Sequence, residues 1–231
     1  MSNNMIKAVF WDIDGTMVMS EPVHDSKMEH VAMLHGIVMS PETKASFHGL
    51  GDRRAYEIMQ GIGMPGTLEQ FVDACQSYYE AQLHTIEVRD GFAEAFTYLE
   101  KHGIHQAAVS NGLEALVNLN LARAGIRDKL KAVVDLDYMV RRGLDPKPSG
   151  DAYLDALRQV NEMEGLSIRP SECLVVEDSP TGVAAGQAAG MKTIYWKLSP
   201  DRSLDNTDYS AYTADEIMAI IRGLVPERAA A

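Results

Sequence analysis

Residues 6–16 read IKAVFWDIDGT, and this stretch decides how the rest of the chain is interpreted. Its first half, residues 6–10, is a short apolar run, which is typical of a buried β-strand. Its second half places Asp12 and Asp14 directly after that strand, followed by Gly15, a residue that favours turns. In open α/β sheets ligands bind beyond the carboxyl ends of the strands, so both carboxylates are expected in such a crevice.

Similar apolar runs predict four more buried strands, at residues 105–109, 132–136, 173–177 and 192–196. Helical stretches separate these strands, and a glycine, the usual C-terminal cap, follows each of them: 91–102, 113–124, 149–164 and 180–189. No strand is predicted after residue 196, and a last helix is expected at 215–224. The repeated strand and helix order predicts an α/β fold with a Rossmann-like parallel sheet and helices on both faces.

The stretch 18–87 breaks this alternation, because it contains no good strand. Apolar residues at helical spacing predict helices there instead, at 24–35, 52–60 and 67–84. We therefore predict an inserted helical domain, residues 18–87, between the two parts of an α/β core domain, residues 1–17 and 88–231.

The composition narrows the classes of partner. The chain has 21 Lys and Arg against 33 Asp and Glu, a net charge of −12 at pH 7. Nucleic acids and anionic membranes are therefore unexpected partners, because binding them needs a basic face. The sequence has neither a bilayer-spanning apolar run nor the apolar core of a signal peptide near its first residues. Cys75 and Cys173 form no CxxC pair, so no disulfide framework or thiolate zinc site is expected, and the cytoplasm is the expected compartment.

Asp12 and Asp14 on their own leave more than one interpretation open. Aspartate and glycine are common in turns, so an ordinary turn is the plain alternative. A calcium-binding loop is another alternative, but it needs Gly at its sixth position and Glu at its twelfth. The chain has Met17 and Val23 at these positions, which excludes the calcium loop.

A second acidic pair, Glu177 and Asp178, ends another predicted strand. Helix capping accounts for Ser179 or Asp178, since such residues stabilise a helix start by about 0.5–2 kcal/mol. Capping does not account for two acidic residues at the end of a buried strand, where like charges repel unless a cation or a base lies between them. Asp12 and Asp178 on neighbouring strand ends would form an oxygen-rich site that suits Mg²⁺.

Two further stretches supply groups that bind anions. Ser110, Asn111 and Gly112 follow a predicted strand and offer a hydroxyl, an amide and a flexible backbone. Taken alone, they form an ordinary turn with a helix cap. Lys147 opens a predicted helix within DPKPSGDAY, and most such lysines are solvated surface residues. Beside a carboxylate cluster and a helix N-terminus, however, a cation completes a pocket for a phosphate group.

The four motifs in this order resemble those of the haloacid dehalogenase-like superfamily of phosphotransferases. They are DIDGT at 12–16, SNG at 110–112, KP at 147–148 followed by Tyr153, and EDSPTG at 177–182. The position of the helical insert resembles the branch with a four-helix cap, which includes phosphoglycolate phosphatases and β-phosphoglucomutases. The resemblance implies a Mg²⁺-dependent phosphatase. Its substrate would be a small sugar phosphate or a phosphoglycolate-like metabolite, hydrolysed through an aspartyl-phosphate.

The resemblance also implies roles for individual residues. Asp12 would be the nucleophile, and Asp14 the general acid and base. Two side chains would hold the phosphoryl oxygens: Ser110 and Lys147. Four acidic residues would provide oxygens for Mg²⁺: Asp12, Asp14 through its backbone carbonyl, Asp178, and Glu177 directly or from behind the other ligands. Further substrate contacts are expected from Thr16, Asn111, His24 and Arg53. The cap would close on hinge strands near residues 17–21 and 87–90, exclude water and select the leaving group.

A mutase of the β-phosphoglucomutase type is the main alternative, since it shares all four motifs. His24 stands where such mutases carry a cap histidine, and Arg53 or Arg54 would grip a second phosphate; the plain interpretation of His24 is a polar residue at a helix start. A phosphonate-cleaving relative needs a cap lysine near a stretch that corresponds to 49–52, where this chain has none. A non-catalytic binding protein is disfavoured because no catalytic group is missing, and Asp14 argues against a dehalogenase, which needs no general acid.

Overall fold

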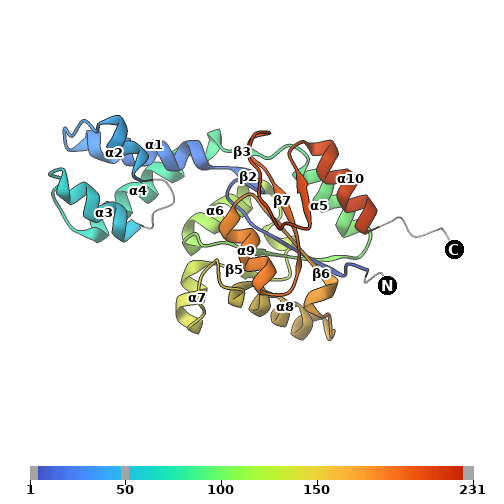
Figure 1. Ribbon diagram of the computed structural model, residues 1–231. Helices are drawn as coiled ribbons and strands as arrows, with labels where there is room; N and C mark the ends of the chain where they lie inside the picture. Colours follow the sequence, from blue (N-terminus) through green and yellow to red (C-terminus); the bar gives the residue numbers. More distant parts are fainter. Residues whose placement is uncertain (1–4, 48–51, 226–231) are drawn as a thin grey trace. The chain divides into compact units, whose positions relative to one another are not determined.

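The computed structural model describes residues 5–47 and 52–225 (Figure 1). The chain divides into two compact units. The larger unit comprises Met1–Met19 and Val88–Ala231, and the smaller unit is Ser20–Glu87. The larger unit has an α/β fold with a parallel sheet, as the sequence predicted, and the smaller unit is helical.

Among the described residues, the sheet of the larger unit has six strands in the order β5-β4-β1-β6-β7-β8. Their bounds are β1 Ala8–Trp11, β4 His105–Val109, β5 Val133–Val134, β6 Cys173–Glu177, β7 Lys192–Trp196 and β8 Tyr209–Ala211. All five pairings are parallel, and β1 lies between β4 and β6. Because parallel strands end at one edge, the residues that follow β1, β4 and β6 come together there.

Helices cover both faces of this sheet. The helices α8 (Asp151–Glu164) and α9 (Pro180–Ala188) pack on one face, and α5 (Phe92–Lys101) and α10 (Ala214–Leu224) pack on the other. Side chains alternate between the faces along a strand, and β1 shows this directly. Phe10 packs against Tyr153 of α8, whereas the next residue, Trp11, packs against Phe92 of α5.

The predicted strand at 132–136 is wrong at its carboxyl end. The strand β5 has only two residues, and α7 (Leu136–Arg142) begins directly afterwards. The side chain of Asp135 accepts a hydrogen bond from the backbone N–H of Tyr138 at 2.8 Å, so this aspartate caps a helix instead of continuing the strand. The remaining helix of this unit that bears on the site is α6 (Glu114–Ala124), which ends at a left-handed glycine, Gly125, as predicted.

The edge strand β8, which pairs with β7, was not predicted. The last predicted helix is present as α10. Short 3₁₀ segments lie at Leu83–Thr85, Arg127–Lys129 and Pro170–Glu172.

The smaller unit is built from α1 (Glu21–Leu34), α2 (Pro41–Ala45), α3 (Asp52–Gly61) and α4 (Leu68–Gln82). Its apolar core includes Met28 and Val31 from α1 and Phe71 and Cys75 from α4. The short helix α2 was not predicted; the side chain of Ser40 caps it. At the ends of this unit, β2 (Val18–Met19) and β3 (Glu87–Val88) pair as a two-stranded sheet, so the chain passes between the units through paired strands.

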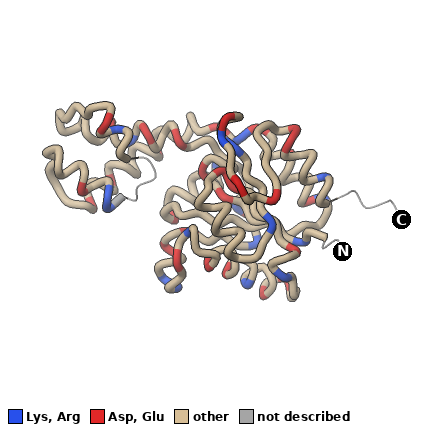
Figure 2. Tube along the Cα trace, viewed as in Figure 1, with Lys and Arg blue, Asp and Glu red and all other residues tan. Residues whose placement is uncertain are grey.

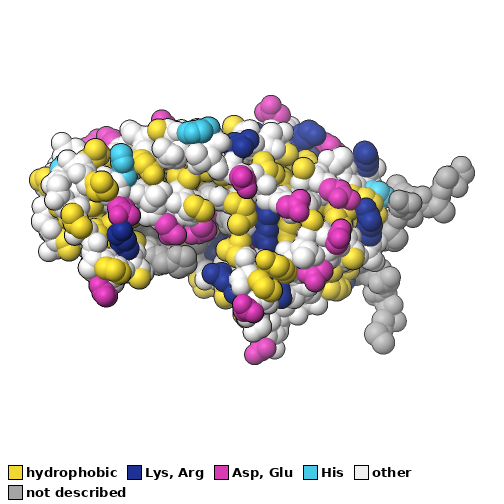
Figure 3. Space-filling view, turned by 90° about the horizontal axis from the view of Figure 1, so that it is seen from above, with side chains coloured by type: hydrophobic (Ala, Val, Ile, Leu, Met, Phe, Trp, Pro, Cys, Tyr) yellow, Lys and Arg dark blue, Asp and Glu magenta, His cyan; other side chains and the backbone are white. Residues whose placement is uncertain are grey.

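Basic and acidic residues are interspersed along the described chain (Figure 2), and charged side chains of both signs lie on the face drawn in Figure 3. In the parts that the structure describes, no helix is both long and apolar enough to cross a membrane. Both cysteines are buried, Cys75 in the smaller unit and Cys173 in the larger one, and neither is part of a disulfide.

Candidate functional site

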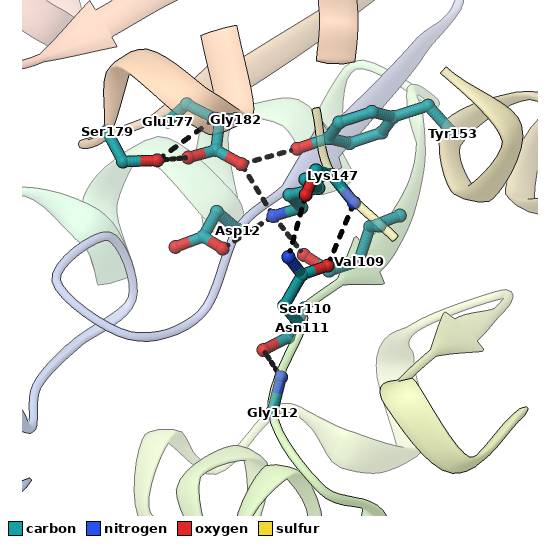
Figure 4. Close-up of polar contacts among 10 residues, drawn as sticks. All are labelled: Asp12, Val109, Ser110, Asn111, Gly112, Lys147, Tyr153, Glu177, Ser179 and Gly182. Atoms are coloured by element: carbon teal, nitrogen blue, oxygen red, sulfur yellow. Dashed lines mark hydrogen bonds and ion pairs between the residues drawn. The ribbon is translucent and has the colours of Figure 1, made fainter. Parts of the chain in front are cut away.

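The predicted core residues meet at the carboxyl edge of the sheet (Figure 4). Asp12 directly follows β1, and its backbone N–H is bonded to the carbonyl of Val176 in β6 at 3.0 Å. Ser110 directly follows β4 and donates its backbone N–H to Val134 of β5 at 2.9 Å. Glu177 ends β6. Strand pairing therefore brings together groups that lie far apart in the sequence.

Lys147 lies at the centre of this cluster. Its ammonium nitrogen Nζ is 2.7 Å from Asp12 Oδ1, 2.5 Å from Glu177 Oε1 and 2.8 Å from the carbonyl oxygen of Val109. An ammonium group has three protons, so three oxygens account for all of them. Asn111 fixes the backbone of this lysine, because its side-chain amide makes two hydrogen bonds with the Lys147 backbone, of 3.1 and 3.2 Å. The amide of Asn111, predicted to contact substrate, is thus engaged in holding Lys147.

Glu177 is held from three sides. In addition to Lys147, the hydroxyl of Tyr153 donates to Glu177 Oε1 at 2.7 Å, and the hydroxyl of Ser179 donates to Oε2 at 3.1 Å. Ser179 also caps α9 by accepting the backbone N–H of Gly182 at 3.0 Å. Burial, together with the neighbouring Glu177 carboxylate, raises the pKa of Tyr153, so its hydroxyl keeps its proton and acts as a donor.

Gly182 leaves room for this carboxylate. A methyl group at Gly182 would lie 1.8 Å from the carboxyl carbon of Glu177, closer than any real contact. We expect Gly182→Ala to displace Glu177 from Lys147 and Tyr153. Overpacking of this kind costs about 1–3 kcal/mol, so the melting temperature should fall by several degrees in a thermal unfolding experiment.

Gly223→Ala is the matched control for this variant. Gly223 lies in the last turn of α10, and a methyl group there would meet nothing within 4 Å. Alanine is the better helix former, so this control should be neutral or slightly stabilising. If Gly182→Ala were as harmless as Gly223→Ala, the space beside Glu177 would not be what position 182 provides.

The surroundings of Asp12 disfavour the ionised form of its carboxyl group. Burial, and next the repulsion from Glu177, raise the pKa of Asp12, while Lys147 opposes that rise. Burial alone would disfavour the ammonium of Lys147, but Asp12 and Glu177 outweigh it and raise the pKa of Lys147. The charge of Lys147 thus offsets that of more than one carboxylate, and Asp178 lies in the same cluster as Asp12 and Glu177. An additional cation would favour the ionised form of Asp12.

Three carboxylate oxygens of this cluster lie close enough together to hold a hard cation. One carboxylate oxygen each from Asp12, Glu177 and Asp178 lies within 4.8 Å of the others. Among the described residues no hydrogen-bond partner is found for Asp12 Oδ2, although this atom is buried. Buried charged oxygens are normally paired or bound to a metal, so the donor set fits a divalent cation such as Mg²⁺.

The turn after Asp12 carries the other predicted groups of the first motif. Gly15 has a left-handed conformation (φ 80°), and a methyl group there would lie 2.4 Å from Asp178 Oδ2, so only glycine fits. The side chain of Asp14 accepts a hydrogen bond from Asn120 Nδ2 at 2.9 Å. The hydroxyl oxygen of Thr16 is buried and has no hydrogen-bond partner within the described residues.

Ser110 adds a hydroxyl at the same edge. Its Oγ accepts the backbone N–H of Gly112 at 2.9 Å, so its own proton is left for another acceptor. The two remaining predicted substrate contacts belong to the smaller unit. His24 lies in α1, with its ring 4.9 Å from the ring of Tyr79 between centroids, and Arg53 lies in α3 with an exposed side chain. Residues 49–51, most of the stretch without a cap lysine, lie outside the described residues.

Sequence reasoning missed two residues that contact the first motif, Asn120 and Arg89. The guanidinium of Arg89 donates to the carbonyl oxygens of Gly15 at 2.6 Å and of Trp196 at 2.9 Å. Burial lowers the pKa of Arg89 to about 10, an effect that Asp178 partly offsets. No feature of the sequence around Arg89 indicates these contacts. Asn120, by contrast, is recognisable as a polar residue on the apolar face of a helix, since Val117 and Leu121 flank it on that face.

Comparisons with known proteins find relatives of this chain among phosphatases. Hexitol phosphatase A of Escherichia coli (strain K12) is 29% identical over 217 residues, which cover 91% of this chain and 93% of that protein. The bifunctional riboflavin kinase/FMN phosphatase of Arabidopsis thaliana is 27% identical over 199 residues, covering 84% of this chain. This chain spans only 50% of that plant protein.

A structural comparison shows the same fold. β-Phosphoglucomutase from Clostridium difficile superposes with a TM-score of 0.75 at 17% sequence identity, covering 96% of this chain and 97% of that one. The family model for haloacid dehalogenase-like hydrolases matches residues 6–190, which include all four motifs. The chain therefore belongs to the haloacid dehalogenase-like hydrolases, in the branch with a helical cap.

Proposed function

We propose that this protein is a phosphatase that hydrolyses a small phosphorylated metabolite through a phosphoaspartate at Asp12. The observation that carries the proposal is the 2.7 Å contact between Asp12 and Lys147 inside a buried carboxylate cluster at the carboxyl edge of the sheet. The reaction class is further supported by hexitol phosphatase A, which aligns with nearly the whole chain. A sugar phosphate or a phosphoglycolate-like ester is the proposed substrate.

In the first step, a carboxylate oxygen of Asp12 attacks phosphorus and the bond from phosphorus to the ester oxygen breaks. The electron pair of that bond leaves with the ester oxygen, which takes a proton from Asp14 and departs as the alcohol. The hydroxyls of Ser110 and Thr16 donate to the phosphoryl oxygens. Since the protons of Lys147 already point to protein oxygens, this lysine acts on the phosphoryl group mainly through its charge.

In the second step, water attacks phosphorus and gives its proton to Asp14, which lost one in the first step. The bond between phosphorus and Asp12 breaks, and its electron pair returns to the carboxylate. Inorganic phosphate leaves, and both aspartates regain their starting protonation states. The proton balance closes because Asp14 serves once as an acid and once as a base.

We also propose Mg²⁺ as the cofactor, held by the carboxylates of Asp12 and Asp178 and the backbone carbonyl of Asp14. The buried oxygen of Asp12 that lacks a hydrogen-bond partner among the described residues supports this choice. Glu177 is bonded to Lys147, so it would orient the groups around the ion instead of binding the ion itself. When bound, Mg²⁺ supplies positive charge that offsets the repulsion between a carboxylate and a phosphate dianion.

The smaller unit is proposed as the cap that selects the leaving group and excludes water from the reaction. His24 and Arg53 would then contact the part of the substrate that is not phosphate. The paired strands β2 and β3, through which the chain passes between the units, are the proposed hinges. We propose the same role for this unit whether the leaving group is a sugar, a sugar alcohol or glycolate.

The test is a panel of hexitol phosphates, fructose 1-phosphate, glycerol phosphate and phosphoglycolate, assayed with Mg²⁺ and with excess EDTA. We expect phosphate release from at least one ester, loss of that release in EDTA, and its recovery when Mg²⁺ is added back. Isomerised sugar phosphate without free phosphate would indicate the mutase instead. No reaction with any ester would contradict both, and undiminished release in EDTA would contradict the proposed cofactor.

A further inference from the structure

Asn120 occupies a core position of α6. Its neighbours on the same helix face, Val117 and Leu121, are buried, and Asn120 itself is 0% exposed. Asparagine is a poor helix former, and burying its amide costs free energy unless hydrogen bonds compensate. Neither apolar packing nor helix propensity explains an asparagine at this position. The contacts of its side-chain amide are the remaining explanation.

The amide contacts the first catalytic motif. Asn120 Nδ2 donates to Asp14 Oδ1 at 2.9 Å, between residues 106 positions apart. The other oxygen of this carboxylate lies towards the turn after β4: a methyl group on Gly112 would lie 3.6 Å from Asp14 Oδ2 and 3.1 Å from Ser110 Oγ. The hydrogen bond from Asn120 therefore sets which oxygen of Asp14 faces the turn after β4.

We propose that Asn120 is a positioning residue for Asp14, which holds Oδ1 so that the carboxylate is oriented with Oδ2 towards the turn after β4. The inference rests on the proposed role of Asp14 as general acid and base. With Oδ1 held in this way, Oδ2 lies on the side of the turn after β4, where Ser110 also lies. Proton transfer needs that oxygen within hydrogen-bond reach of the leaving group, and a misplacement of about 1 Å can cost 10²-fold in rate.

The test replaces Asn120 by leucine, which has nearly the same size and no N–H donor. Single-turnover rates of phosphoaspartate formation are measured with two esters. One is para-nitrophenyl phosphate, whose leaving group needs no proton, and the other is the alkyl phosphate hydrolysed fastest in the panel. We expect a loss of about 10- to 100-fold with the alkyl ester and of less than about 3-fold with the aryl ester, with little change in KM.

Asn161→Leu is the matched control. Asn161 lies in α8, where its amide bonds the backbone N–H and carbonyl of Ile168 at 2.8 and 3.0 Å, so it is also a helix asparagine that holds a polar group. Any rate loss in this control should be equal for the two esters. If Asn120→Leu does not fold, Asn120→Ala removes the same donor without overpacking, and the same contrast between the esters is expected.

A double-mutant cycle separates positioning from a general structural effect. In the Asp14→Asn background, Asn120→Leu should cause no further loss with the alkyl ester, because the group that it positions is already gone. If Asp14→Asn distinguishes the esters but Asn120→Leu slows both equally, the inference about Asn120 is overturned and the proposed function stands. If Asp14→Asn does not distinguish them, the general-acid role fails and the inference fails with it.

Discussion

Asp12→Asn is expected to abolish turnover while the protein stays folded. An amide oxygen is a poor nucleophile, and loss of a catalytic nucleophile costs about 10⁴-fold or more in kcat. The melting temperature should stay the same or rise. Because burial and the repulsion from Glu177 raise the pKa of Asp12, the ionised form is less stable in the folded chain than in the unfolded chain at neutral pH. A neutral amide removes that penalty, and Lys147 keeps its contact with Glu177.

Asp208→Asn is the matched control for the loss of an aspartate. The carboxylate of Asp208 accepts the backbone N–H of Thr193 at 2.8 Å near the amino end of β7, at the opposite edge of the sheet. Turnover should survive in this variant. Wild-type protein quenched during turnover should carry a phosphoryl group on residue 12 by mass spectrometry. Retained turnover in Asp12→Asn, with no phosphoryl group on residue 12 of the wild type, would refute the nucleophile assignment.

Three strands of the sheet could be predicted from the sequence to the residue, whereas β1 begins two residues later and ends one residue later than the predicted run 6–10. The observed bounds of β4, β6 and β7 coincide with the predicted runs 105–109, 173–177 and 192–196. Strands buried on both faces need continuous apolar residues, and short runs of this kind bounded by polar turns have few other interpretations. The helices between them end at glycines for a similarly local reason, since a left-handed residue is favoured at that position.

The elements that were missed depend on single side chains or on distant partners. The strand β5 is cut short because Asp135 caps a helix, and a capping aspartate looks the same as any other polar residue in an apolar run. The edge strand β8 has three residues, too few to establish a period of two. Its existence depends on pairing with β7, which the sequence around it does not reveal.

The candidate site also has one part that the sequence predicts and one part that it does not. The motif residues could be expected to meet because each follows a strand, and parallel strands end at one edge. The side chains that hold them could not, because they come from elsewhere: Asn120 lies 106 positions from Asp14 and Arg89 lies 74 from Gly15. The motifs therefore predict which groups react, and tertiary packing determines which groups orient them.

Asp14→Asn is expected to separate esters by their leaving groups. Asp14 is proposed to protonate the departing oxygen, and general acid catalysis contributes about 10²–10⁴-fold. An alkyl phosphate has a basic leaving group that needs this proton, whereas nitrophenolate leaves well without it. The rate of phosphoaspartate formation should therefore fall by about 10²-fold or more with the alkyl ester and far less with para-nitrophenyl phosphate.

The measurement must isolate the first chemical step. Asp14 is also proposed to take the proton of the attacking water, so its loss would slow the second step equally for all esters and hide the contrast in steady state. Rapid-quench single-turnover kinetics with excess enzyme report phosphoaspartate formation directly. The amide of Asn120 can still donate to the side-chain oxygen of the amide introduced at position 14, so the variant tests the proton and leaves the packing intact. An equal loss of the first-step rate for both esters would mean that Asp14 orders the site through its backbone and its shape, and that the leaving group takes its proton from another source.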